Sequence, residues 1–176
     1  MKLRYAALAV TVLFVSSQSR ADEVVVKGAH LCCGACVKAV GAALADVEGV
    51  TDAQCDRDAK SITFAVENAE AAEAGIKALA EAGFSGRAKL GEERVKYPPA
   101  KIKKGTKADG VTFTGVHLCC GGCVKRATAA VEELEGVDEV KVDRETKTLE
   151  LVGNDIDVRK SFRALRKAGF YAKVKK

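Results

Sequence analysis

The sequence predicts an α+β protein made of two tandem βαββαβ sandwiches, each a four-stranded antiparallel sheet with two helices on one face. Two observations carry this prediction. The string His-Leu-Cys-Cys-Gly-x-Cys-Val-Lys occurs at 30–38 and again at 117–125, 87 positions further along the chain. In both copies, strand-like and helix-like spacings of apolar residues then follow in the same order.

The repeat extends well beyond the cysteine motif. At the same shift, Asp56-Arg57 aligns with Asp143-Arg144, and after a one-residue gap Gly83-Phe84 aligns with Gly169-Phe170. Each unit is about 65 residues long, near the lower limit for a domain with its own core. We therefore expect a first domain at 22–90, a linker at 91–110 and a second domain at 111–176.

The first half of each copy predicts a strand followed by a helix. β-branched runs at 24–26 and 111–116 lead directly into the cysteines and predict the first strands. After the cysteines, apolar residues recur at a spacing of three to four, which predicts a helix with one apolar face. These residues are Val37, Val40, Leu44 and Val47 in the first copy, and Val124, Ala127, Val131 and Leu134 in the second.

The second half of each copy predicts two strands, a helix and a last strand. A Gly-Val pair begins the second strand, and the third is centred on 62–66 or 149–151. Gly83 and Gly169 suit the left-handed end of the second helix. The segments 85–90 and 171–174 complete the sheets as fourth strands. This order is that of a ferredoxin-like sandwich.

Residues 1–21 resemble a secretory signal peptide. Lys2 and Arg4 precede an apolar run at 6–15, and small residues flank position 20. A membrane anchor is the alternative, but the run is about half of the ~20 apolar residues that cross a bilayer. We expect cleavage after Ala21 and an exported protein, periplasmic or secreted, with no integral membrane segment.

Charge and cysteine usage narrow the function. Removal of 1–21 lowers the formal net charge from +5 to +2, and the interspersed charges do not suggest nucleic-acid binding. Six of the seven cysteines lie in two tight clusters, which favours a metal or redox site over a framework of disulfides.

The linker holds Pro98 and Pro99 among six basic residues. It is expected to be an extended solvated spacer, with polyanion binding as the alternative.

Each cysteine motif has the chemistry of a soft-metal site. Cys33 and Cys36, like Cys120 and Cys123, are spaced so that two sulfurs converge at the beginning of a helix, where free N–H groups favour thiolates. Thiolates select Cu(I), Hg(II), Zn(II) or Cd(II) over magnesium and calcium. Two or three sulfurs per copy suit the low coordination numbers of Cu(I) or Hg(II).

Both copies resemble the heavy-metal-associated domains, which occur in copper chaperones, copper-transporting ATPases and periplasmic mercury-binding proteins. The resemblance implies that Cys33, Cys36, Cys120 and Cys123 bind the metal. Leu31 and Leu118 replace the methionine that packs beneath the loop in that family. The closing Gly-Phe pairs are more similar to the copper-ATPase domains and so favour copper over mercury.

Two departures from the family add candidate ligands. Cys32 and Cys119 are either buried spectators or third ligands. Adjacent side chains on an extended segment point in opposite directions, which is the ground for the spectator role. For His30 and His117 three roles are open: metal ligand, stabiliser of a thiolate, or packing of the loop.

Three other residues carry weaker indications. Cys55 aligns with Val142 and is expected to be an apolar filler. Lys38 and Lys125 either offset the charge of a metal-thiolate complex or are simply solvated.

Together these features predict a monomeric, non-catalytic exported protein that carries or buffers Cu(I) or Hg(II), with one site per domain. Its partners would be a metal-donating or metal-accepting thiol protein or transporter. The rival functions are thiol–disulfide exchange through the same cysteine pairs and a structural module with cross-linking sulfurs.

Overall fold

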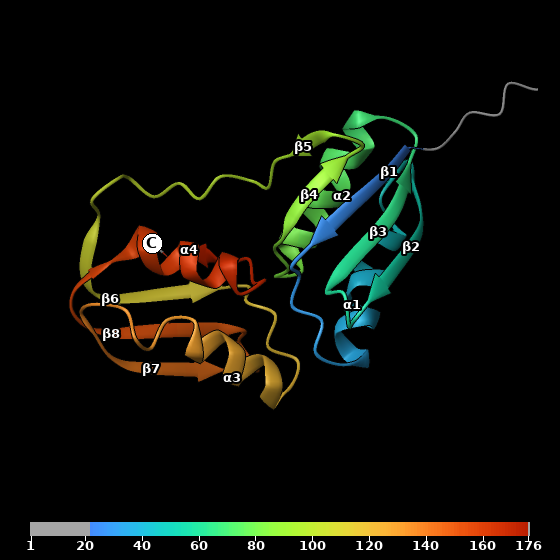
Figure 1. Ribbon diagram of the computed structural model, residues 1–176. Helices are drawn as coiled ribbons and strands as arrows, with labels where there is room; N and C mark the ends of the chain where they lie inside the picture. The colour runs from blue at the N-terminus through green and yellow to red at the C-terminus, as the bar shows by residue number, and fades with distance from the viewer. Residues whose placement is uncertain (1–21, 176) are drawn as a thin grey trace, which may run out of the picture.

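The computed structural model describes residues 22–175 and contains two antiparallel sheets, one in each repeat (Figure 1). The expected signal peptide at 1–21 lies outside the described residues. The first repeat comprises β1 (Asp22–Lys27), α1 (Gly34–Ala45), β2 (Val50–Asp56), β3 (Ser61–Val66), α2 (Ala69–Glu81), β4 (Arg87–Leu90) and β5 (Glu93–Val95). The second comprises β6 (Lys107–Thr114), α3 (Gly121–Ala129), β7 (Val137–Asp143), β8 (Thr148–Asp157), α4 (Val158–Lys167) and β9 (Lys173–Val174). The predicted fold class is confirmed.

The strand order is β2-β3-β1-β4-β5 in the first sheet and β7-β8-β6-β9 in the second. In both, the first strand of the repeat lies between the third and the fourth, as a split βαβ topology requires. Ile62, Phe64 and Val66 alternate with half-exposed residues along β3 and are buried. Leu149 and Leu151 are buried in the same way in β8. One face of each sheet therefore packs against helices.

The first sheet contains one strand more than expected. Leu90 pairs with Glu93 across a tight turn in which Gly91 has a φ of 57°. Such a two-residue hairpin favours glycine, because a positive φ matches the twist of the flanking strands. Thus β5 lies within the segment 91–110 that was expected to be linker, and β6 already begins at Lys107.

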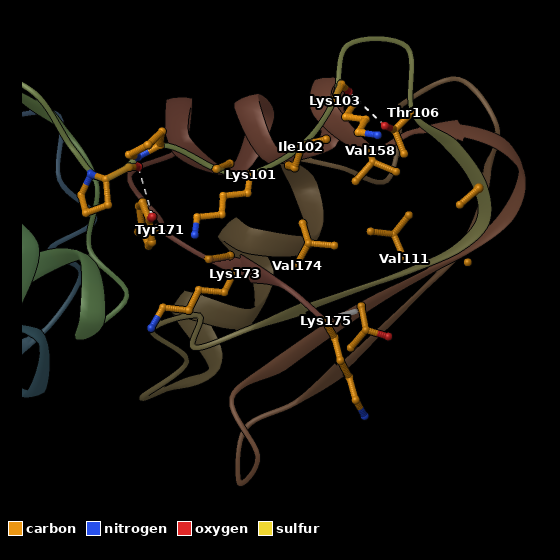
Figure 2. Close-up of a pocket in the computed structure, with 17 residues that line it drawn as sticks. Lys101, Ile102, Lys103, Thr106, Val111, Val158, Tyr171, Lys173, Val174 and Lys175 are labelled. Atoms are coloured by element: carbon orange, nitrogen blue, oxygen red, sulfur yellow. Dashed lines mark hydrogen bonds between the residues drawn. The ribbon is translucent and has the colours of Figure 1, made fainter.

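The remaining connection packs on the second repeat and is not an open spacer. Tyr97 is buried, its ring centroid is 6.2 Å from that of Tyr171, and the Arg166 guanidinium lies 5.1 Å from the Tyr97 ring centroid. The Tyr171 hydroxyl donates to the Pro98 carbonyl at 3.1 Å (Figure 2). Proline and charge alone predicted an extended spacer, whereas the buried Tyr97 beside the prolines packs this connection onto the second repeat.

A groove under this connection is lined by 98–103 and Thr106 of the connection, by the segment 171–175 that contains β9, and by parts of β6 and Val158 (Figure 2). Its lining residues include lysines and apolar side chains but no cysteine, histidine or carboxylate. It therefore offers no ligand for a soft metal. Within residues 22–175, no helix has both the length and the apolar character that crossing a bilayer would need.

Candidate metal centre

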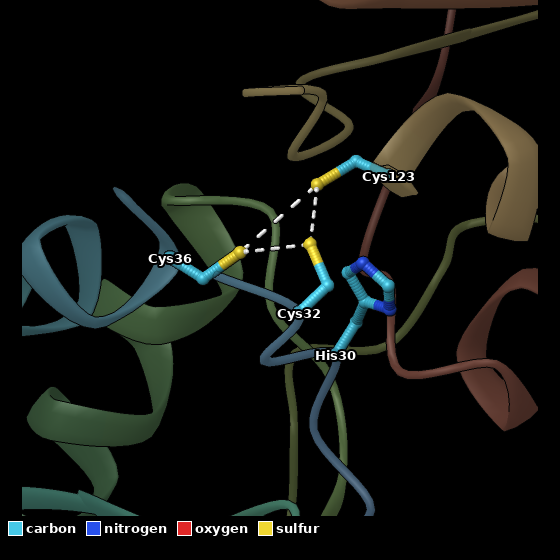
Figure 3. Close-up of side chains that lie close together, drawn as sticks. All are labelled: His30, Cys32, Cys36 and Cys123. Carbon is cyan, nitrogen blue, oxygen red and sulfur yellow. Dashed lines mark hydrogen bonds between the residues drawn. The ribbon is translucent and has the colours of Figure 1, made fainter. Parts of the chain in front are cut away.

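The two cysteine motifs meet, and sulfurs of one repeat lie against sulfurs of the other. The Cys32 Sγ is 3.4 Å from the Cys120 Sγ and 3.6 Å from the Cys123 Sγ. The Cys119 Sγ is 3.7 Å from the Cys33 Sγ and 3.6 Å from the Cys36 Sγ. Figure 3 shows Cys32 and Cys36 facing Cys123 across this contact. We expected one site in each domain, whereas the structure brings all six sulfurs into one group.

Each Cys-x-x-Cys pair spans the beginning of a helix, as predicted. Cys33 and Cys120 are the residues that precede the first turns of α1 and α3, and both have extended backbones. Their sulfurs lie 3.8 Å from the Cys36 Sγ and 3.7 Å from the Cys123 Sγ, respectively. The first helical turn has N–H groups without helical partners. The four sulfurs thus lie where the peptide dipoles favour negative charge.

Backbone N–H groups act directly on the ionisation of these thiols. The N–H of Cys123, together with the neighbouring Cys32 thiol, lowers the pKa of Cys120 to about 6. Burial opposes ionisation of Cys36, but hydrogen bonds from the backbone at Cys33 and Cys32 outweigh it and lower the pKa of that thiol. Burial dominates at Cys123 and raises its pKa. The pocket therefore favours thiolates at some positions and thiols at others.

The additional cysteines point into the sulfur group. Cys32 lies 3.6 Å from the Cys36 sulfur, and Cys119 lies 3.4 Å from the Cys123 sulfur. Burial, followed by hydrogen bonds from these thiols to neighbouring sulfurs, raises the pKa of both Cys32 and Cys119. They are placed as third sulfurs of each motif rather than on the opposite side of the loop.

The two histidines stack on phenylalanines of the other repeat. The ring centroids of His30 and Phe170 are 4.5 Å apart, and those of His117 and Phe84 are 4.3 Å apart. In both histidines the Nε2 atom is buried without a hydrogen-bond partner. Burial, aided at His30 by the positive charge of Arg126, lowers the pKa of His30 to about 4 and also lowers that of His117. Both shifts favour the neutral ring, the form that binds metals.

The repeats are joined through the two Gly-Phe segments. Phe84 and Phe170 form an antiparallel bridge, and the N–H of Tyr171 donates to the Gly83 carbonyl at 2.8 Å. In return, the N–H of Ser85 donates to the Gly169 carbonyl at 2.9 Å. These contacts hold the motif loops opposite each other, so the Gly-Phe repeat marks an interface as well as a helix end.

Both glycines are required by this interface. Gly83 and Gly169 have φ values of 85° and 95°, in the left-handed region that glycine adopts readily. A Cβ on Gly83 would lie 2.5 Å from the Gly115 carbonyl oxygen and 2.5 Å from the His117 nitrogen. A Cβ on Gly169 would lie 2.8 Å from the Gly28 carbonyl oxygen and would meet the His30 nitrogen.

Two arginines that we did not single out from the sequence contact the motif loops. Arg57 donates to the Cys32 carbonyl at 3.3 Å, and Arg144 donates to the Cys119 carbonyl at 2.9 Å. The preceding Asp56 and Asp143 accept backbone N–H groups of the hairpin turns that present these arginines. The repeated Asp-Arg pair was the signal that could have identified them.

The weaker candidates lie mostly outside the sulfur group. Cys55 is half-buried in β2 opposite Ile62 and belongs to none of the ligand groups found among the described residues. Lys38 and Lys125 are exposed, as expected of solvated lysines. Leu31 and Leu118, at the position of the family's methionine, are buried.

The comparisons with known proteins agree with the resemblance inferred from the motif. Residues 112–170 match the family described as the heavy-metal-associated domain. A curated relative, heavy metal-associated isoprenylated plant protein 44 of Arabidopsis thaliana, is 43% identical over 54 residues. The aligned segment covers 31% of this chain and 29% of that protein. The family match supports a heavy-metal-binding role for the second repeat. The first repeat carries the same cysteine motif.

Solved structures give matches of wider coverage and low overall superposition. The oxidized MerP from Ralstonia metallidurans CH34 is 26% identical, with 40% of this chain and all of that chain covered and a TM-score of 0.36. The N-terminal soluble domains of Bacillus subtilis CopA are 21% identical, with 89% and 95% covered and a TM-score of 0.33.

Proposed function

We propose that this protein is a non-catalytic, exported carrier or buffer of soft metal ions, with Cu(I) as the first candidate cargo and Hg(II) as the second. In this proposal residues 1–21 direct export and are removed. The protein receives its ion from a thiol protein or transporter and passes it to another.

The observation that carries the proposal is the convergence of six cysteine sulfurs at two helix N-termini. Such a group lacks the carboxylate and carbonyl oxygens that calcium and magnesium prefer, and its thiolates suit soft cations. All seven cysteines are free. Cys33 and Cys120 are only partly buried, which leaves sulfurs accessible to an incoming thiol ligand that exchanges the ion.

The spacing of the sulfurs favours coordination by three or more of them. At a metal–sulfur distance of about 2.3 Å, two sulfurs on opposite sides of an ion lie about 4.6 Å apart, and three around it lie about 4.0 Å apart. The sulfurs of Cys32, Cys36 and Cys123 are separated by 3.6, 3.6 and 4.0 Å. Three sulfurs in this arrangement need only small movements to surround one ion.

Native mass spectrometry of the reduced, processed protein, supplied in turn with Cu(I), Hg(II) and Zn(II), tests the proposal. We expect retention of Cu(I) and Hg(II) against a competing small thiol, and loss of both when all six motif cysteines are replaced by serine. Cys55→Ser is the matched control and should bind as the unmodified protein does. The mass of the exported chain should correspond to cleavage after Ala21.

The same preparation distinguishes the rival redox function. A protein that retains none of these ions but catalyses oxidation or reduction of a dithiol substrate would be a thiol–disulfide exchange protein, and the metal proposal would be wrong.

A further inference from the structure

The Cys36 and Cys123 sulfurs each lie within 4.0 Å of two sulfurs of their own motif and two of the other, unlike the other four motif sulfurs. The Cys36 Sγ lies 3.6 Å from the Cys32 Sγ of its own motif and 3.6 Å from the Cys119 Sγ of the other. The Cys123 Sγ lies 3.4 Å from the Cys119 Sγ and 3.6 Å from the Cys32 Sγ. Cys36 and Cys123 are both fully buried and lie 4.0 Å from each other. They occupy the middle of the sulfur group.

Two of the three potential ligand groups found among the described residues share this central pair, and the third consists of Cys32, Cys33 and Cys120. One consists of His30, Cys32, Cys36 and Cys123, and the other of Cys36, His117, Cys119 and Cys123. The ligand atoms within each group lie within 4.8 Å of one another. The two groups are equivalent in the repeat, which pairs His30 with His117, Cys32 with Cys119 and Cys36 with Cys123. If each group held one ion, the Cys36 and Cys123 sulfurs would bridge the two ions.

We propose that the two repeats hold Cu(I) as one polynuclear thiolate centre bridged by Cys36 and Cys123, instead of one independent ion per repeat. This inference rests on the proposed function and adds the form in which the metal is held. Binding needs no redox step: Cu(I) leaves a thiolate donor, copper–sulfur bonds form here, and the protons of the thiols pass to the solvent.

Electrostatics argue against two separate ions at this distance. A Cu(I) bound by Cys33 and Cys36 alone carries one net negative charge, as does one bound by Cys120 and Cys123. The Cys33 and Cys120 sulfurs of these complexes are 3.9 Å apart, where like charges repel strongly in a partly desolvated site. A bridging thiolate serves two ions at once, so a shared centre needs fewer thiolates per ion and carries less negative charge per ion.

The interface that would support this centre is built from backbone as well as side chains. The Gly83 and Gly169 carbonyls accept N–H groups of the opposite repeat, and His30 and His117 stack on the phenylalanines that follow these glycines. The N–H of His30 also faces the Gly169 carbonyl at 3.4 Å. The contacts that align the sulfurs are therefore independent of the sulfurs themselves.

Cys36→Ser tests the sharing directly. With independent sites, this variant loses one of two Cu(I) ions and keeps a normal site in the second repeat. With a shared centre, it should lose the copper–copper scattering seen by X-ray absorption and weaken copper retention at both motifs. Cys55→Ser, a change of the same kind outside the ligand groups, should retain the copper–copper scattering and the stoichiometry of the unmodified protein.

Gly169→Ala tests the interface while keeping every sulfur. The added methyl group would press against the loop that carries His30 and separate the motifs. We expect loss of copper–copper scattering with retention of Cu(I) by the individual pairs. Gly105→Ala is the control, because Gly105 also has a positive φ, 78°, but no atom lies within 4 Å of the point that its new methyl group would occupy. It should therefore preserve the centre.

The outcomes separate this inference from the function on which it rests. Two Cu(I) ions per chain without copper–copper scattering, reduced to one by Cys36→Ser, would refute the shared centre and leave the carrier function intact. Failure of the unmodified protein to bind Cu(I) would refute both.

Discussion

In the first repeat α1 is 12 residues long and the sheet has five strands, whereas in the second α3 is 9 residues long and the sheet has four. The motif loops, the Asp-Arg turns and the Gly-Phe segments, by contrast, are nearly the same in both repeats. These shared segments are the ones that meet around the sulfurs, while β5 lies away from them (Figure 1). Sequence identity between the repeats is therefore concentrated in the segments that form their mutual interface and is not spread evenly over the fold.

Loss of a core leucine should have the largest effect on stability and a similar effect in both repeats. Leu79 in α2 and Leu165 in α4 are equivalent, and both are fully buried. Replacement of either by alanine removes apolar contacts and leaves a cavity, so we expect a loss of about 2–5 kcal/mol in the free energy of unfolding. Denaturant titration of the metal-free protein measures it.

The half-exposed Leu90 supplies the control for these core variants. Leu90→Ala should cost less than either core change, because less apolar surface returns to water. A marked inequality between Leu79→Ala and Leu165→Ala would contradict the view that the two cores are equivalent.

Helix caps should reveal a smaller difference between the repeats. The Asp157 side chain accepts the N–H groups of both Arg159 and Lys160 at the beginning of α4. The Asn68 side chain accepts only that of Ala71 at the beginning of α2. We expect Asp157→Ala to cost about 1–2 kcal/mol of unfolding free energy and Asn68→Ala about 1 kcal/mol. Thermal unfolding of the two variants, followed by circular dichroism, measures both losses. A larger loss of stability in Asn68→Ala than in Asp157→Ala would contradict this prediction.

Much of this arrangement could be predicted from local sequence. The alternation of Ile62, Phe64 and Val66 identifies a strand with one buried face, and the apolar spacing after the cysteines identifies a helix that begins at the motif. Gly83 was interpreted correctly as a helix end, since its φ is 85°. These features depend on neighbours along the chain, which the sequence contains.

The contact between the two cysteine motifs could not be predicted from local sequence. The atoms closest to a Cβ on Gly83 belong to Gly115 and His117 of the other repeat, and no periodicity reports contacts between separate domains. The orientation of Cys32 cannot be predicted from the sequence either, because the alternation of an extended strand does not apply to a loop that turns into a helix. The packing of Tyr97 on Tyr171 is likewise a contact between distant segments, which the prolines and lysines around Tyr97 do not indicate.

The two arginines offer the finest test of the comparison between repeats. Arg144 makes contacts of 3.4 and 2.9 Å with the carbonyls of Leu118 and Cys119, whereas Arg57 makes one contact of 3.3 Å with that of Cys32. Both side chains are exposed, so solvent weakens their contribution. We expect alanine at either position to accelerate transfer of Cu(I) to a competing chelator by about two- to fivefold, equivalent to roughly 0.5–1 kcal/mol, with the greater effect at Arg144. Stopped-flow absorbance measures the rate, and Arg87→Ala on the exposed face of β4 is the control. Equal rates for Arg144→Ala and Arg87→Ala would mean that the arginine contacts do not hold the loops, and that the Gly-Phe interface alone positions the sulfurs.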